Sequence, residues 1–188
     1  MTIIEHFEKF LGPVQQGWRE TNAQENDPRL MVVRFSNTPF EAASTYATIG
    51  LSDHLLELAD GRQVRQELLF AAHDNYASDE IASFLLSFSE FVRSKSWALA
   101  RGDVVGPSAA LIPGVAVNSV LRMFSGYFSG RSGPLQWVFT VDHNCLACTF
   151  DWRRRISCKE NRGDSFEEML ERSNPDLLDL NRPGIISG

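Results

Sequence analysis

The stretch Thr48-Ile49-Gly50-Leu51-Ser52-Asp53-His54, followed by Arg65-Gln66-Glu67-Leu68-Leu69, indicates two neighbouring strands of a sheet. Between the two lies Asp60-Gly61, which is a strong signal for a tight turn joining two strands. We therefore expect a strand over residues 46–58 and a returning strand over residues 64–72.

Two details of this strand pair bear on its place in the sheet. The first strand has a potential break near Gly50 or at the Ser-Asp-His that follows it, because glycine interrupts regular strand pairing. The returning strand contains Leu68-Leu69-Phe70-Ala71, which is apolar on both faces. A strand of this kind belongs at the centre of a sheet with both faces covered.

The rest of the chain alternates helical and strand patterns, which predicts an α+β fold. Thr2 and Glu5 form a capping box that opens a helix over residues 2–11, and Ser78 is the expected N-cap of the clearest helix. The sheet should be mixed or largely antiparallel and flanked by helices. The other elements expected are helices over 78–95 and 164–173 and strands over 31–35, 120–128, 135–141 and 148–156.

Length and composition restrict the class of protein. The 188 residues, 43% of them hydrophobic and 22% charged, are expected to form one domain, 1–188. The net charge of −6 and the pI near 5.2 argue against nucleic acid as a partner. No apolar run approaches a membrane span, and the start of the chain is acidic where a signal peptide is basic. With three cysteines, this predicts a cytoplasmic protein.

His143, Cys145, Cys148 and Cys158 form the one candidate metal cluster. Zinc accepts thiolates and histidine, and a Cys-x-x-Cys pair suits it. Structural zinc sites usually bring a second paired knuckle, which Cys158 does not supply. We therefore interpret these side chains as buried thiols and a turn histidine, and we expect no cofactor.

His54 and Glu67 are the candidate acid–base pair. If the two strands pair across Asp60-Gly61, residues whose numbers sum to about 121 face each other, and His54 lies opposite Glu67. Such a pair can transfer protons, but a structural contact is the favoured interpretation. A buried Glu67 needs a donor, because an unpaired buried carboxylate is costly. Arg62, Arg65 or His54 could supply it.

The order and spacing of several short motifs resemble the suppressor-of-fused (SUFU-like) family over about residues 31–184. Each motif alone is weak, and the combination carries the resemblance. The motifs are Thr48–His54, Arg65–Leu69, Arg101–Val105, Ile112–Gly114, Ile156–Glu160 with Gly163, and the ending Pro175-Asp176-Leu177-Leu178-Asp179-Leu180-Asn181-Arg182-Pro183.

The resemblance implies a curved sheet flanked by helices, in a domain that binds another protein and performs no catalysis. We expect no second domain after the ending, so the resemblance is to the single-domain bacterial members. These are thought to include immunity proteins that neutralise polymorphic toxins. The alternatives are a small hydrolase or metal-dependent enzyme using His54 and Glu67 or the cysteines, and a regulatory scaffold without a toxin partner.

The resemblance also assigns expected roles to individual residues. The partner surface should include the Ser52–His54 segment and the loop from Gly102 to Gly114, because binding residues favour loops on a rigid scaffold. Within the family motifs, the remaining charged positions are expected to be structural. The partner-binding residues are Asp53, His54, Gly102 and Asp103, and the structural residues are Arg65, Glu67, Asp179 and Arg182.

Overall fold

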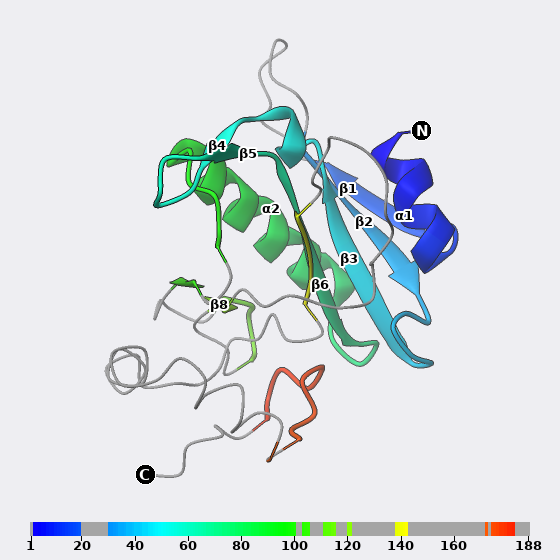
Figure 1. Ribbon diagram of the computed structural model, residues 1–188. Coiled ribbons are helices and arrows are strands. Elements are labelled where there is room, and N and C mark those ends of the chain that lie inside the picture. Colours follow the sequence, from blue (N-terminus) through cyan, green and yellow to red (C-terminus); the bar gives the residue numbers. More distant parts are fainter. Residues whose placement is uncertain are drawn as a thin grey trace, which may run out of the picture.

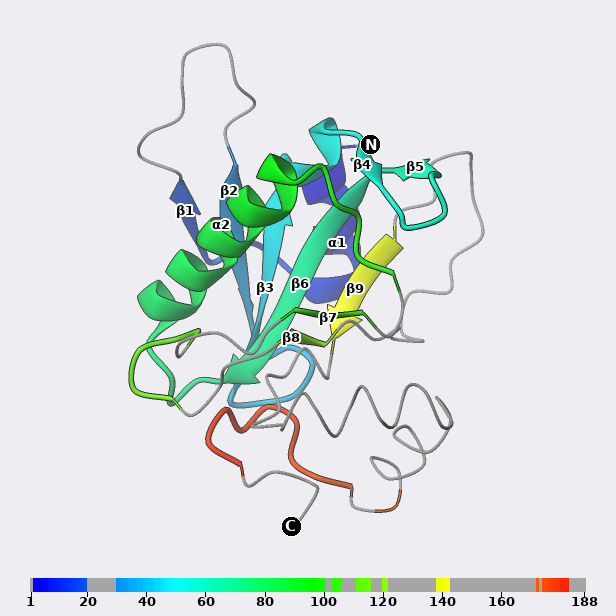
Figure 2. The same ribbon diagram turned by 90° about the vertical axis from the view of Figure 1, so that its left-hand side faces the viewer.

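In the computed structural model, a five-stranded sheet lies between two helices (Figure 1). The structure describes residues 2–19, 30–100, 103–105, 111–115, 120–121, 138–142, 172 and 174–182. Helix α1 packs on one face of the sheet and α2 on the other, as the turned view shows (Figure 2). The predicted α+β class and mixed sheet are confirmed.

The strand order in the main sheet is β1-β2-β3-β6-β9. Its first four strands pair antiparallel, and β9 runs parallel to β6. Two-stranded pairs β4–β5 and β7–β8 stand beside it. In chain order, the elements are α1 Ile3–Leu11, β1 Gln16–Arg19, β2 Met31–Ser36, β3 Ala43–Ile49, the 3-10 turn η1 Leu51–Asp53, β4 Leu56–Glu57, β5 Gln63–Val64, β6 Gln66–His73, α2 Ser78–Ser94, β7 Val104–Val105, β8 Val120–Leu121 and β9 Val138–Asp142.

Both helices follow from local sequence signals. Thr2 and Glu5 bond reciprocally as the predicted capping box at the start of α1. In α2 the predicted apolar stripe is buried. Ala77, however, is the N-cap residue of α2, and Ser78 is its first helical residue. The hydroxyl of Ser78 contacts Arg34 and Tyr46 instead of capping the helix.

The core has two layers because successive strand residues point to opposite faces. The α2 side holds the larger cluster, and the α1 side holds a smaller one. The larger layer includes Val32, Tyr46, Phe70, Ile81, Phe84 and Leu85, and the smaller contains Phe7, Leu11, Val33, Phe35, Ala47 and Leu69. The predicted central position of residues 64–72 is confirmed, since β6 lies between β3 and β9 with seven of its eight residues buried.

The strand expected over residues 46–58 is interrupted at Gly50, where the sequence indicated a potential break. Gly50 has φ 97° in the left-handed region, where glycine is favoured. Strand β3 ends before it, η1 follows, and the chain resumes as the short β4. The Asp60-Gly61 turn therefore closes only the β4–β5 pair, in which Leu56 faces Val64.

Several sequence predictions lie outside the described residues. They are the strand over 148–156, the strand over 120–128 beyond Leu121, the start of the strand over 135–141, most of the helix over 164–173, the motif Ile156–Glu160, the cluster of His143, Cys145, Cys148 and Cys158, and Gly102. In the described part of the chain, no helix is long and apolar enough to cross a membrane.

Candidate protein-binding site

The Glu67 carboxylate lies at the start of β6 and is 1% exposed. Its Oε1 accepts hydrogen bonds from the backbone N–H of Gly50 at 3.0 Å and of Ser52 at 3.1 Å, and from the Ser52 hydroxyl at 2.7 Å. Its Oε2 accepts from the Thr48 hydroxyl at 2.6 Å. One side chain thus fastens the end of β3 and the whole η1 turn to the central strand.

The expected pairing of His54 with Glu67 is wrong. Strands β3 and β6 pair with Ala47 opposite Leu69, and the chain leaves the sheet at Gly50 before His54 is reached. The groups that hydrogen-bond Glu67 are neutral amides and hydroxyls rather than the predicted arginine or histidine. Burial raises the pKa of the Glu67 carboxyl, and the bonds from Thr48, Ser52 and Gly50 oppose that rise.

The substitution Glu67→Gln replaces the titrating carboxyl with an amide and tests whether the pKa of Glu67 is raised in the folded state. Because the folded-state pKa of Glu67 lies above the reference value of 4.5, its protonation favours the folded state. Its contribution to stability is therefore full below that value and is lost as pH rises through the folded-state pKa. We expect the free energy of unfolding of the wild type, relative to Glu67→Gln, to fall as pH rises above 4.5. Urea denaturation at a series of pH values measures this difference in the free energy of unfolding. If the difference increased with pH, the pKa of Glu67 would be lowered in the folded state.

Arg65 supports the same turn from the outside. Its exposed guanidinium donates to the carbonyl oxygens of Ser52 at 2.7 Å and Asp53 at 2.8 Å. These carbonyls lie at the end of η1, where helical turns leave acceptors unpaired. Arg65 therefore binds carbonyl oxygens of this short segment, and Glu67 binds N–H groups of it. These contacts favour the structural role expected for both residues.

Gln66 is a structural residue that the sequence analysis missed. It is fully buried, donates to the Leu99 carbonyl at 2.8 Å and accepts from the Leu99 N–H at 2.9 Å. Its amide thus replaces a strand partner for the segment after α2. A polar residue between Arg65 and an apolar run was the available signal, because a buried amide needs both a donor and an acceptor.

The outer side of the η1 turn is open to solvent. Asp53 is exposed, Leu55 is 52% exposed and His54 is partly buried. Among the described residues, the buried Nε2 of His54 has no hydrogen-bond partner. The turn whose inner groups are fixed by Glu67 therefore presents the side chain of Asp53 to solvent, with the partly buried His54 beside it.

The second predicted surface segment is linked to the first. Glu57 of β4 bridges to Trp97, with its N–H bound to the Ser96 carbonyl at 2.7 Å and its carbonyl to the Ala98 N–H at 2.8 Å. Four residues beyond Leu99, the Asp103 carboxylate accepts from the Ala100 N–H at 2.6 Å. Asp103 thus shapes a turn in a segment anchored to both β4 and β6.

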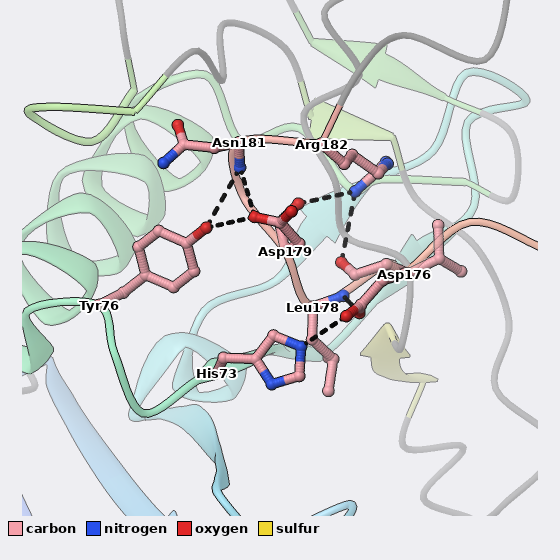
Figure 3. A network of polar contacts seen from close by, with 8 residues as sticks. His73, Tyr76, Asp176, Leu178, Asp179, Asn181 and Arg182 are labelled. Atoms are coloured by element: carbon pink, nitrogen blue, oxygen red, sulfur yellow. Dashed lines mark hydrogen bonds and ion pairs between the residues drawn. The ribbon is translucent and has the colours of Figure 1, made fainter.

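The ending of the chain docks on the connection between β6 and α2 (Figure 3). The Tyr76 hydroxyl donates to the Asp179 carboxylate at 2.5 Å, which also accepts from the Asn181 N–H at 2.9 Å. The His73 ring contacts Asp176 at 2.7 Å. Leu180 is 1% exposed in the larger core cluster.

These contacts shift the pKa values of Asp179 and of Tyr76, to which it is bound. The hydrogen bonds from Tyr76 and the Asn181 backbone lower the pKa of Asp179, and burial with the bond to Asp179 raises the pKa of Tyr76. The Arg182 guanidinium, 8% exposed, reaches the carbonyl oxygens of Leu177 and Asp179 at 3.4 and 3.5 Å. These contacts favour the structural role expected for Asp179 and Arg182.

The polar contacts of Arg65, Gln66, Glu67 and Asp179 hold backbone segments in place. His54 and Glu67 are not brought together as a proton-transfer pair. No group of three or more His, Cys, Asp or Glu side chains suited to a metal ion occurs in the described ranges. The arrangement is that of an α+β domain with an exposed turn fixed to its central strand.

The family of the chain follows from comparison with known proteins. The model of the suppressor of fused protein (SUFU) family matches residues 26–125, which is more than half of the chain. The chain belongs to the SUFU family, as the sequence resemblance predicted. The matched range includes the η1 turn and all of β6.

A solved structure extends the comparison of the fold. The crystal structure of a SUFU homologue from Neisseria gonorrhoeae FA 1090 is similar with a TM-score of 0.69 and 15% sequence identity. The match covers 98% of this chain and 94% of that chain. At this identity the likeness establishes the SUFU-like fold alone. No curated protein sequence matches the chain.

Proposed function

We propose that this chain is a non-enzymatic protein-binding domain whose partner surface is built around the η1 turn. The observation that carries the proposal is the turn itself. Glu67 and Arg65 fix its backbone, while Asp53 and Leu55 face solvent. A pre-ordered surface loses little conformational entropy on association. SUFU family membership supports a role in protein interaction.

The charge distribution favours a basic partner. Residues 1–100 carry eight Lys and Arg against fourteen Asp and Glu, so the net charge of −6 falls entirely in this half. A negative surface speeds association with a positive partner through electrostatic steering. We therefore propose an immunity protein that covers a basic toxin domain in the cytoplasm. A regulatory scaffold would use the same surface for a partner without toxicity.

An enzyme is the less favoured function. The hydrolase alternative needs His54 and Glu67 to share a reacting proton, and the four groups bound to Glu67 belong instead to Thr48, Gly50 and Ser52. The metal-dependent alternative needs the cluster of His143 and the cysteines, which lies outside the described residues.

Charge reversal on the turn should weaken partner capture. The immobilised chain is used to capture protein from its source cell, with Asp53→Lys and His54→Ala beside the wild type. Asp53→Lys should reduce affinity for a basic partner about tenfold, mainly through slower association and with stronger effects at low salt. Surface plasmon resonance with the captured protein measures both rates.

Glu41→Lys is the matched control because Glu41 is exposed on the β2–β3 connection. It makes the same charge change away from η1 and should retain the wild-type affinity. Equal loss in both lysine variants would mean that net charge acts without a local surface. Equal binding by all variants would reject the proposed surface. Co-expression with the captured protein separates the functions, since an immunity protein restores growth that its toxin arrests.

A further inference from the structure

Helix α2 crosses the strands β2 and β3 on one face of the sheet (Figure 2). Hydrogen-bond donors from these three elements meet near the start of α2. Arg34 on β2 faces Tyr46 on β3 in the strand register. The guanidinium donates to the Ser78 hydroxyl at 2.8 Å and to the Ser36 hydroxyl at 3.2 Å. The Tyr46 hydroxyl lies 2.9 Å from the Ser78 hydroxyl. Within the described ranges, the hydrogen bonds of the Arg34 guanidinium therefore go to neutral hydroxyls.

The cluster has more donor hydrogens than acceptors. Arginine carries five N–H groups and accepts none, and each hydroxyl adds one hydrogen. Arg34 and Tyr46 both point a donor at the Ser78 oxygen. Whichever hydroxyl donates across the Tyr46–Ser78 contact, the other hydroxyl's hydrogen finds no acceptor within that pair. The buried Nε of Arg34 also has no partner among the described residues.

The neighbouring carboxylates do not balance this surplus. Asp79 accepts from the Trp18 indole N–H at 2.7 Å, and Asp74 accepts from the Ser44 hydroxyl at 2.5 Å. Neither forms an ion pair with Arg34 in the described part of the chain. Burial raises the pKa of Tyr46, so its phenol stays neutral and is no counter-ion either. The Arg34 charge is partly buried, and no carboxylate of the described residues is bound to it directly.

We propose that Arg34, Ser36, Tyr46 and Ser78 form a binding site for one oxyanion, with phosphate preferred over carboxylate. An oxyanion supplies the acceptors that the cluster lacks, and arginine with hydroxyl donors is a common way to bind it. The donors come from three elements, β2, β3 and α2, and therefore approach from different directions. A tetrahedral group with several oxygens meets such donors better than a planar carboxylate. Ala77 gives α2 no side-chain cap, and the positive helix end adds attraction.

The site is tested with inorganic phosphate, acetate and chloride at matched ionic strength. Phosphate should raise the melting temperature of the wild type saturably, by about 3–5 °C at ten times its dissociation constant. The amide resonances of residues 78 and 79 should shift along the same curve. Arg34→Gln should abolish both effects, and Arg34→Lys should weaken binding about tenfold because it loses the planar fork.

Arg62→Gln is the control, since Arg62 is an exposed arginine paired with Asp60 on the β4–β5 turn. It should keep the full phosphate response. Ser78→Ala keeps Arg34 and should weaken phosphate binding several-fold, which serves if Arg34→Gln fails to fold. A stronger response to phosphate supports the tetrahedral site, and an equal response to acetate overturns the preference for phosphate. The proposal fails if neither anion exceeds chloride, or if Arg34→Gln responds as the wild type does.

Discussion

Glu67→Ala should lower the free energy of unfolding by roughly 3–5 kcal/mol. The substitution leaves four donors without their acceptor: the N–H groups of Gly50 and Ser52 and the hydroxyls of Thr48 and Ser52. Burying such groups unpaired is among the costliest changes a single residue can make. The η1 turn should loosen first, because Glu67 is its link to β6. Urea denaturation gives the free energy, and hydrogen exchange at residues 50–54 reports the turn.

Glu67→Gln is the graded comparison and should cost less, roughly 1–3 kcal/mol at neutral pH. Its carbonyl oxygen can take the three bonds now made to Oε1. Its amide can donate to the Thr48 hydroxyl, whose hydrogen then turns to the Leu68 carbonyl 3.4 Å away. An alanine variant as stable as the glutamine variant would contradict the acceptor role of Glu67. A fully stable glutamine variant that lost a measurable turnover would instead favour catalysis.

Leu180→Ala should destabilise the protein by about 2–5 kcal/mol, the range for truncating a buried leucine. Leu180 is 1% exposed and belongs to the same core cluster as β2, β3, β6 and α2. The loss should also release the contacts around it, including the Tyr76–Asp179 hydrogen bond. Thermal and urea denaturation measure the change, and hydrogen exchange at the Asn181 amide, which donates to Asp179, follows the release.

Leu55→Ala is the matched control because it makes the same truncation at a leucine that is 52% exposed. Its effect on stability should stay within about 0.5 kcal/mol. If the two variants are equally stable, the ending of the chain does not anchor the fold. The family motif in this ending would then need a role other than packing.

Local signals predicted the elements that depend on nearby residues. The Thr2–Glu5 capping box, the apolar stripe of α2 and the two-sided apolar run of β6 each belong to a continuous segment. The pairing register of the strands was not predicted correctly. The turn at Asp60-Gly61 joins only β4 and β5, and the long strands pair with Ala47 opposite Leu69. A period of two identifies a strand but does not say where a left-handed glycine ends it.

The candidate site shows the same division between near and distant information. From the sequence we predicted that a buried Glu67 needs a donor. The donors expected were the charged or titratable side chains nearby, Arg62, Arg65 or His54. The actual donors include the backbone N–H groups of Gly50 and Ser52, which no side-chain pattern can reveal. The Tyr76–Asp179 bond joins residues 103 positions apart, so only the fold brings them together.

The parallel pairing of β6 with β9 also determines when the sheet can be completed during synthesis. Gln66 pairs with Val138, which leaves the ribosome 72 residues later. At about 5–20 residues per second, that delay lasts several seconds. During it, the largely buried strand β6 has a partner only on its β3 side, and its other edge is open to pairing with another nascent chain. The central strand β6, which joins the two sides of the mature sheet, is thus open to misassembly while the chain is unfinished.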